Sequence, residues 1–415
     1  MLPVDSPLLA VYDPRVKKKP PKIAEVGNLP EPSDEFAANL APRPQERLLL
    51  DWLRGGFATK NGPVLATGKR LLCNTVGRGQ FAAQMARDFP TATVDCHFFD
   101  LFSQQLVAGE QATEDQQPAA NLTLHCAADL PTGPVDSLAW FISQRGEAEL
   151  ARDSLQDGHD KLKIGGWFWA VTDNSADQWL YEQMQPLFSK VTRLPLAEGV
   201  IYQAIKTAPL KKRRDFSCEF PTKSGERWLR LRTRPGVFSH RHVDPGARVL
   251  IHGFQTGQLN DFDATDLDAP PQPLIQPGMK VLDLGCGCGV VGLMAAMQAE
   301  NVRVVCADSH TRAIESVQWG IEQNGLSGVT AVLDCNGTQI ETATFDLALL
   351  NPPYFANFRI AEHFVRTSHR SLRPGGKVLI VTKTPQWYLD FMPALFENVQ
   401  SVPVKNYVLV SGERK

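Results

Sequence analysis

The chain has 415 residues, 43% of them hydrophobic and 21% charged, with a formal net charge of −2 at pH 7. This length favours two domains, and this composition excludes a disordered or fibrous protein. No apolar run reaches the roughly 18 residues of a membrane helix, no secretory signal is evident, and the cysteines form no CxxC pair, so a cytoplasmic protein without a membrane partner is expected.

The predicted elements fall into two similar series. Residues 1–40 are rich in proline and charge and predict an extended arm. Beyond it, short apolar runs alternate with helix-like segments, which predicts a parallel sheet covered by helices, twice over. The predicted strands lie at 70–74, 92–99, 137–143 and 166–172, and again at 280–285, 302–308, 330–334, 346–353 and 377–382.

The two series share one spacing, which indicates duplication of a single α/β unit. Cys73 and Asp283 are separated by 210 residues, and at the same offset LKIGGWFWAVT (162–172) aligns with LRPGGKVLIVT (372–382). We therefore expect one domain at 41–210 and a second at 211–415, with a hairpin-like segment just after the junction.

A basic band surrounds this junction. Residues 206–248 hold twelve Lys or Arg and four acidic residues, a local charge of +8. Such a band is typical of a polyanion-binding face, although a solvated linker and hairpin would have the same composition. The predicted RNA-binding residues are Lys211, Lys212, Arg213, Arg214, Arg230 and Arg232.

A glycine loop follows the first strand of the second series. Gly285, Gly287 and Gly289 let the backbone turn sharply and approach a ligand closely, in a GxGxG spacing that differs from the GxGxxG of dinucleotide-binding folds. Asp283, at the strand end, is suited to holding the loop or binding a ligand ammonium, whereas it would repel the pyrophosphate of NAD. The loop therefore favours S-adenosylmethionine as the cofactor.

Two further acids end the next strands. Asp308 lies 19 residues after Gly289, where a carboxylate accepts hydrogen bonds from ribose hydroxyls. Asp334 follows the third strand, where it could accept from the adenine amino group. Each acid alone is also a common turn former, but together they mark the ligand crevice of an open α/β fold.

The fourth strand ends in Asn351-Pro352-Pro353-Tyr354. The prolines cannot continue a sheet, so they present the Asn351 side chain and the Pro352 carbonyl as fixed acceptors. Two acceptors can hold one planar NH2 group, while Tyr354 offers a face for stacking a flat ring. A plain turn is the alternative interpretation. The histidines and cysteines lack zinc-like spacing, so no metal site is predicted.

These motifs resemble those of the class I methyltransferases and, more narrowly, the two-domain ribosomal-RNA guanine-N2 methyltransferases of the RsmC/RlmG type. The resemblance covers residues 44–415 and extends to RPGVFSHRHVDPGARVLI (234–251). It implies that Phe238, Asp244, Gly246 and Asn351 join the cofactor site, and that Asn351, Pro352, Pro353 and Tyr354 are catalytic. The family usually has phenylalanine where this chain has Tyr354, which leaves guanine and adenine both open as target bases.

The first copy has lost these motifs, as the resemblance also implies. It is expected to bind no S-adenosylmethionine and instead to support the catalytic half or hold RNA. At the 210-residue offset, Asp283, Gly285, Asp308 and Asn351 are replaced by Cys73, Thr75, Phe98 and Phe141.

The fold expected is thus a tandem pair of Rossmann-like domains, the first degenerate and the second catalytic. The resemblance implies a monomeric enzyme that methylates the guanine N2 amine in ribosomal RNA or a ribosomal subunit. Adenine N6, a protein glutamine N5, and a non-catalytic RNA-binding or ribosome-assembly factor are the alternatives. No role is predicted for the acidic segment at 252–279.

Overall fold

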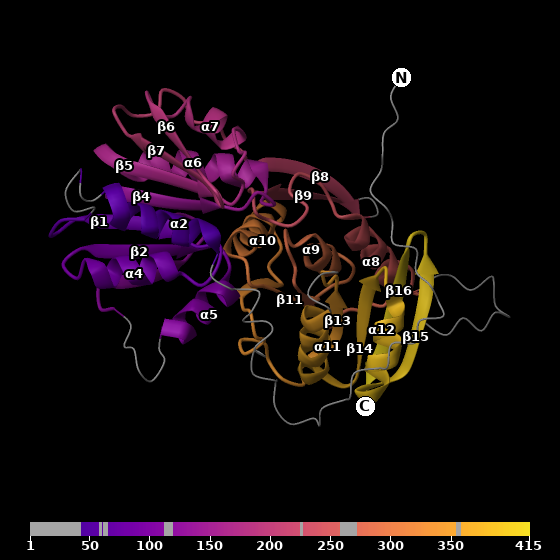
Figure 1. Ribbon diagram of the computed structural model, residues 1–415. Coiled ribbons are helices and arrows are strands. Elements are labelled where there is room, and N and C mark those ends of the chain that lie inside the picture. The colour runs from indigo at the N-terminus through magenta and orange to yellow at the C-terminus, as the bar shows by residue number, and fades with distance from the viewer. Residues whose placement is uncertain are drawn as a thin grey trace, which may run out of the picture.

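A computed structural model describes residues 43–57, 60, 65–111, 119–224, 227–257, 272–353 and 358–415. The chain forms two lobes, each built around a sheet, and a hairpin runs between them (Figure 1). The predicted arm at 1–40 and residues 258–271 of the acidic segment lie outside the described residues.

The first lobe contains a sheet of seven described strands in the order β3-β2-β1-β4-β5-β7-β6. Its strands are β1 (Arg70–Asn74), β2 (Thr93–Phe98), β3 (Leu122–Cys126), β4 (Val135–Ile142), β5 (Leu162–Thr172), β6 (Val191–Leu196) and β7 (Gly199–Ile205). Its helices are α2 (Pro44–Trp52), η1 (Leu53–Phe57), α4 (Gln80–Asp88), α5 (Leu101–Gln111), α6 (Ala148–Lys161) and α7 (Trp179–Met184).

The second lobe repeats this order as β12-β11-β10-β13-β14-β16-β15. Its strands are β10 (Lys280–Leu284), β11 (Arg303–Asp308), β12 (Val329–Leu333), β13 (Phe345–Leu350), β14 (Leu372–Thr382), β15 (Phe396–Val404) and β16 (Tyr407–Arg414). Its helices are α8 (Pro245–Thr256), α9 (Val290–Ala296), α10 (Thr311–Asn324), α11 (Arg359–Ser371), α12 (Pro385–Phe391) and η3 (Met392–Ala394).

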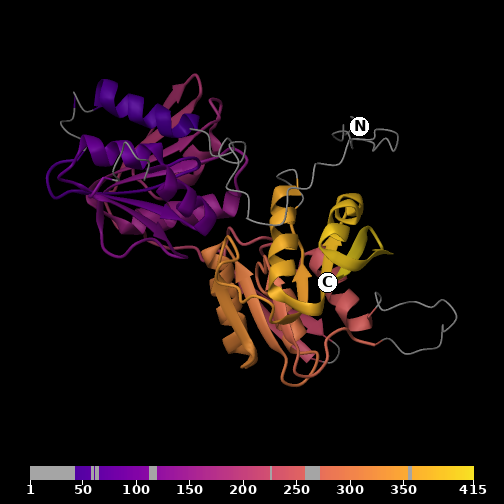
Figure 2. The same cartoon turned by 90° about the horizontal axis from the view of Figure 1, so that it is seen from below.

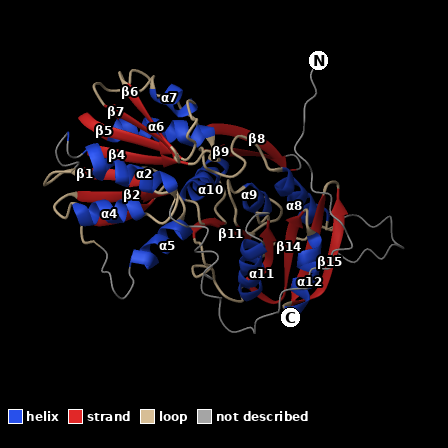
Figure 3. Cartoon of the chain, viewed as in Figure 1, coloured by secondary structure: helices blue, strands red, loops and turns tan. Residues whose placement is uncertain are grey.

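The duplication predicted from the sequence is confirmed by the strand positions. The strands β1, β2, β4 and β5 each begin 210 residues before β10, β11, β13 and β14. Both sheets also have the same strand order, and helices cover both faces of each sheet (Figure 3). The chain is therefore a tandem pair of Rossmann-like domains.

The two sheets predicted as parallel are mixed, because each has antiparallel strands at one edge. In the first lobe β7 pairs antiparallel with β5 and β6, and in the second lobe β16 pairs antiparallel with β14 and β15. The antiparallel strands β6 and β15 are only partly buried, and each contains a proline (Pro195 and Pro403), so neither resembles an apolar central strand.

The core of the second lobe lies on both faces of its sheet. Val281 packs in one hydrophobic cluster with α8 and α9, while Leu282 and Leu284 pack in another with α11. Parallel strands buried on both faces read as continuous apolar runs, which is why β10 was recognisable from the sequence. Among the described residues, no helix combines the length and the apolar character needed to cross a bilayer.

The predicted hairpin is present as β8 (Cys218–Ser224) and β9 (Arg227–Thr233), paired antiparallel. It packs along α10 of the second lobe through β9. Viewed from below, the lobes lie side by side and meet beside α10 (Figure 2). The carboxyl ends of β2 and β11 face each other at this junction, because Asp100 and His310 just beyond them form an antiparallel bridge.

Candidate active site

The glycine loop connects β10 to α9 with all three glycines at positive φ. Gly285, Gly287 and Gly289 have φ of 72°, 53° and 81°, which glycine adopts without a steric penalty. A Cβ on Gly285 would lie 2.6 Å from the Phe364 ring, and one on Gly289 would lie 2.8 Å from Val317. A Cβ on Gly287 would meet nothing within 4 Å. The outer glycines therefore allow close packing, while Gly287 borders open space that a ligand can enter.

Asp283 lies beneath this loop and is almost completely buried, with 3% of its surface exposed. Its Oδ2 accepts a hydrogen bond of 2.7 Å from the backbone N–H of Gly292 in α9. Desolvation raises the pKa of Asp283 to about 7, with a smaller contribution from the negative charge of Asp308. The side chain thus holds the first turns of α9 and changes charge near neutral pH.

Asp308 holds the glycine loop from the neighbouring strand. Its Oδ2 accepts from the backbone N–H of Gly287 at 2.8 Å, and its Oδ1 accepts from that of His310 at 2.9 Å. Desolvation raises the pKa of Asp308. Asp308 therefore holds the glycine loop itself, while Asp283 holds the helix that follows the loop.

Asp334 is engaged within its own turn. Its carboxylate accepts from the backbone N–H groups of Asn336, Gly337 and Gln339 at 3.0, 2.9 and 2.8 Å. It is buried, with 6% of its surface exposed. The side chain therefore shapes the loop after β12, and its contact with adenine stays a prediction.

The Asn351 side chain is fixed by Asp244, a residue 107 positions earlier. The amide Nδ2 donates to Asp244 Oδ2 at 3.0 Å, and the same carboxylate caps α8 by accepting from Ala247 N at 2.9 Å. Because Nδ2 is engaged in this way, Oδ1 is the amide atom that is left to accept a hydrogen bond from a ligand. A Cβ at Gly246 would lie 3.1 Å from that oxygen, so glycine keeps space beside it. The prolines that follow, Pro352 and Pro353, are buried and half-buried.

Of the two aromatic residues predicted for the site, Phe238 is among the described residues and Tyr354 is not. Phe238 lies on the segment between β9 and α8, and it is 66% exposed. Tyr354 lies outside the described residues. The stacking function predicted for Tyr354 therefore stays a prediction.

The equivalent site in the first lobe is filled by protein side chains. Phe141, at the position of Asn351, is buried and packs edge-on against Phe81 with ring centroids 5.1 Å apart. Glu46 of α2, a residue that the sequence analysis did not single out, accepts from Phe81 N at 3.0 Å and from the Thr75 hydroxyl at 2.5 Å. Thr75 in turn accepts from the backbone of Gly77 at 3.0 Å. A buried carboxylate and two rings thus occupy the region that the glycine loop borders in the second lobe.

The model of the methyltransferase small domain family matches residues 228–411. Two curated relatives cover most of the chain. Ribosomal RNA large subunit methyltransferase G of Photobacterium profundum is 26% identical over 72% of this chain and 75% of its own length. Ribosomal RNA small subunit methyltransferase C of Actinobacillus pleuropneumoniae (serotype 3) is 23% identical over 85% of this chain and 96% of its own length.

The chain is similar to the class I methyltransferases of the RsmC/RlmG type along most of its length, and it contains a methyltransferase small domain.

The fold of this methyltransferase agrees with a solved structure along almost its whole length. The T. thermophilus 16S rRNA N2 G1207 methyltransferase (RsmC), solved in complex with AdoMet and guanosine, superposes with a TM-score of 0.69 at 20% identity. The match covers 90% of this chain and 93% of that structure.

The described residues fit S-adenosylmethionine, the cofactor of the family. The open space at Gly287 admits a ligand, and the Asp308 carboxylate lies beside it, where it could accept from ribose hydroxyls. Asp283 holds the start of α9 behind the same loop, and its contact with a cationic amino group stays a prediction. The first lobe offers neither acid, since Cys73 and Phe98 stand at those positions. The second lobe is therefore the catalytic domain.

We expect cofactor affinity to depend on pH through Asp283. Its pKa is about 7 in the free protein, so lowering the pH from about 8 to about 6 protonates it and removes its attraction for the cofactor's cationic groups. Isothermal titration calorimetry should show the Kd for S-adenosylmethionine rising severalfold over this range, with proton release on binding at the acidic end. The Asp283→Asn variant should lose most of this pH dependence. An equally steep change of Kd with pH in the variant would contradict the role assigned to Asp283.

The two lobes contact each other through equivalent residues, as in a two-fold dimer. The backbone N–H of Leu101 donates to the Ser309 carbonyl at 2.9 Å, and the N–H of Thr311 donates to the Phe99 carbonyl at 2.8 Å. At the 210-residue offset Leu101 corresponds to Thr311 and Phe99 corresponds to Ser309, so the two hydrogen bonds are equivalent. Asp100 also accepts from the Ser309 hydroxyl at 2.5 Å. The first lobe therefore supports the turn that directly follows Asp308.

Arg312 anchors this junction and was not foreseen from the sequence. It is fully buried and ion-paired to Asp153 at 2.9 Å and to Asp157 at 3.6 Å, both on α6 of the first lobe. Its guanidinium also donates to the Pro235 carbonyl at 2.8 Å and lies 4.3 Å from the centroid of the Phe99 ring. The side chain thus joins both lobes and the segment that leads to α8.

The predicted RNA-binding residues do not all remain available. Arg213 is paired with Asp157 and Asp160 of the first lobe, so it contributes to the junction between the lobes. Lys211 and Lys212 are exposed. The others are Arg214, whose guanidinium lies 4.9 Å from the centroid of the Phe216 ring, Arg230, which is exposed on β9, and Arg232, which donates to Ser217 at 3.3 Å.

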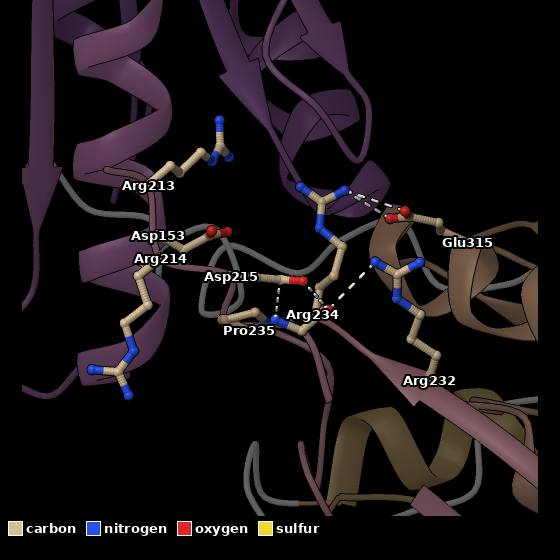
Figure 4. Close-up of a pocket in the computed structure, with 9 residues that line it drawn as sticks. Asp153, Arg213, Arg214, Asp215, Arg232, Arg234, Pro235 and Glu315 are labelled. Carbon is tan, nitrogen blue, oxygen red and sulfur yellow. Dashed lines mark hydrogen bonds and ion pairs between the residues drawn. The ribbon is translucent and has the colours of Figure 1, made fainter. Parts of the chain in front are cut away.

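A pocket opens beside these residues where the lobes meet (Figure 4). Arg234, at its centre, is paired with Asp129 at 2.8 Å and with Glu315 at 3.0 Å. The pocket lining has nearly as many acidic as basic side chains, so the pocket is an ion-paired junction and not a strongly positive binding site. Its lining consists of Asp153, Arg213, Arg214, Asp215, Ser217, Arg232, Arg234, Pro235 and Glu315.

Proposed function

We propose that this methyltransferase transfers a methyl group to the exocyclic N2 amine of a guanine in ribosomal RNA. The observation that carries the proposal is the Asn351 amide, fixed by Asp244 so that Oδ1 is presented as an acceptor at the end of β13. The names of the relatives that align along most of the chain, which methylate large- or small-subunit ribosomal RNA, support this substrate.

The chemistry follows from two acceptors placed beside the cofactor region. Asn351 Oδ1 and the Pro352 carbonyl would each accept one N–H of the guanine amine, which directs the nitrogen lone pair out of the ring plane toward the glycine loop. When bound, S-adenosylmethionine would supply a methyl group that its sulfonium charge has already activated; the electron pair of the broken S–CH3 bond would stay on sulfur, and the methylated amine would release one N–H proton to water. Catalysis then consists chiefly of positioning and polarising the amine, which requires no metal.

Asp244 acts in this scheme as a positioning residue. Because its carboxylate accepts from Asn351 Nδ2, the amide cannot rotate to present its NH2 group to the guanine amine, where two donors would face each other. Asp244 is itself fixed as the N-cap of α8. The end of one helix therefore determines the acceptor geometry.

We further propose domain boundaries at 41–210 and 211–415 and a monomeric enzyme that works in the cytoplasm, where ribosomal RNA is its substrate. The internal two-fold junction supports the monomer, because the first lobe already covers the surface that a second copy would use. Lys211, Lys212 and Arg214 lie exposed beside the junction and would contact RNA phosphates.

Labelled cofactor and mass spectrometry of nucleosides test the proposal directly. Ribosomal RNA and ribosomal subunits from cells that lack this protein are incubated with the enzyme and methyl-labelled S-adenosylmethionine, then digested. We expect label in N2-methylguanosine. Label in N6-methyladenosine or in a methylated glutamine would refute the guanine assignment, and a protein that binds no cofactor would instead be a non-catalytic factor.

A further inference from the structure

The hairpin between the lobes has one buried face and one exposed face. Leu229 and Leu231 of β9 are fully buried against the second lobe. Side chains alternate along a strand, so Trp228, Arg230 and Arg232 lie on the opposite face. Their partners on β8 are Lys223, Pro221 and Glu219, which share that face because directly paired residues do.

Trp228 is an exposed aromatic side chain on this outer face, with 60% of its surface accessible. The ammonium of Lys223 lies 5.5 Å from the centroid of the ring. An indole exposed to this extent contributes little to the core. Together with a cation at its face, it has the composition of a platform on which an unpaired base stacks.

The hairpin is held rigidly, as a stacking platform requires. Asn324, at the end of α10, accepts from the backbone N–H of Arg230 at 2.9 Å and donates to the carbonyl of the same residue at 2.9 Å. This pair of bonds closes the free edge of β9. The Arg230 side chain points outward and pairs with Glu219 at 3.1 Å, with both side chains at least half exposed. Such a pair is weak and readily exchanged for another anion.

The charge and spacing of the outer face suit a nucleic acid backbone. Residues 218–233 hold four basic and two acidic residues, in a chain whose net charge is negative. Alternate residues along β9 are separated by about 6.7 Å, which is comparable to the separation of successive phosphates in an extended strand. Arg232 reaches the interlobe pocket (Figure 4), and the segment from Pro235 leads from there to Asp244 and Asn351.

We propose that the outer face of the β8–β9 hairpin binds a single-stranded segment of the RNA substrate, with one base stacked on Trp228 and adjacent phosphates on Arg230 and Arg232. This inference rests on the proposed function, because that function identifies RNA as the binding partner. It concerns a surface that is separate from the methyl-transfer site. Unpaired RNA is the form whose bases are free to stack on a protein side chain.

Fluorescence anisotropy with a labelled single-stranded RNA of about 12 nucleotides tests this surface. The Trp228→Ala variant of the full chain should bind about tenfold more weakly, while Trp228→Phe should retain most of the affinity because it keeps a stacking ring. Arg230→Gln should reduce the slope of log Kd against log salt by about 0.7, the value for one phosphate contact on a single strand.

Ile164→Ala is the matched control, because Ile164 is also 60% exposed and lies on the first lobe away from the hairpin. Unchanged binding in Trp228→Ala would overturn the proposal, as would an equal loss of affinity for a fully paired duplex. A loss seen only with intact ribosomal subunits would assign the face to a ribosomal protein. None of these results alters the nucleoside product of the wild-type enzyme, so the two proposals fail separately.

Discussion

The Asn351→Ala variant is expected to lose about a hundredfold to a thousandfold in kcat while its Kd for S-adenosylmethionine changes by less than about twofold. The alanine removes one of the two acceptors that would orient the amine, but it leaves the glycine loop and Asp308 untouched. Single-turnover methylation of ribosomal RNA and calorimetry of cofactor binding measure the two quantities independently. A variant with near wild-type turnover would show that the amine is held elsewhere.

Exchanging the side chains at positions 244 and 351 provides a sharper control. Asn351→Asp alone would place two carboxylates at hydrogen-bond distance, because Asp244 Oδ2 lies 3.0 Å from the Asn351 amide. We expect little activity from this variant. Adding Asp244→Asn restores a donor–acceptor pair in the reverse direction and keeps an outward oxygen at 351, so the double variant should recover at least part of the lost turnover. No recovery would mean that the contact serves only the fold.

The Arg312→Met variant is expected to lower the free energy of unfolding by about 3–5 kcal/mol. Methionine replaces the buried volume but leaves Asp153 without its cation and Asp157 with Arg213 alone at the junction between the lobes. Burial raises the pKa of Asp157 even with both arginines present, so the carboxylates that lose Arg312 should take up protons more readily in the variant. Urea unfolding at neutral pH measures the loss.

A surface arginine at the same junction gives the comparison. Arg241 pairs with Glu149 of the first lobe at 2.8 Å, but its side chain is 41% exposed. Arg241→Ala should therefore cost less than about 1 kcal/mol. Equal losses for Arg241→Ala and Arg312→Met would contradict the view that Arg312 anchors the lobes.

Most of the sheet could be predicted because its strands are buried on both faces. Continuous apolar runs such as 280–285 identify central parallel strands, and the constant offset identifies the duplication. The antiparallel edges β6, β7, β15 and β16 were missed. The outer strands β6 and β15 are half-covered and carry a proline, so their pattern resembles that of loops.

The candidate site could be predicted wherever its residues are close in sequence or lie at successive strand ends. Asp283 and the glycine loop belong to one segment, and Asp308 converges on that loop because adjacent parallel strands end at one edge. The contact between Asp244 and Asn351 spans 107 residues, and no spacing rule foretells it. The signal available in the sequence was Asp244-Pro245 before an apolar helix, because Asp followed by Pro is typical of a helix N-cap.

Counting charges could not separate functional arginines from structural ones. Arg213 and Arg232 both lie in the basic band, but the acids of α6 that pair with Arg213 belong to the other lobe. Ion pairs between lobes depend on how the lobes meet. The bridge between Asp100 and His310, which determines that arrangement, involves a contact that neither lobe's sequence reveals alone.

A crystal structure with S-adenosylhomocysteine and guanosine would show where the target amine lies relative to Asn351. We expect the ribose hydroxyls of the cofactor within hydrogen-bond distance of Asp308, and the guanine amine bonded to Asn351 Oδ1 and the Pro352 carbonyl, facing the cofactor sulfur. A nucleoside bound in the first lobe, or an amine directed away from Asn351, would contradict this expectation.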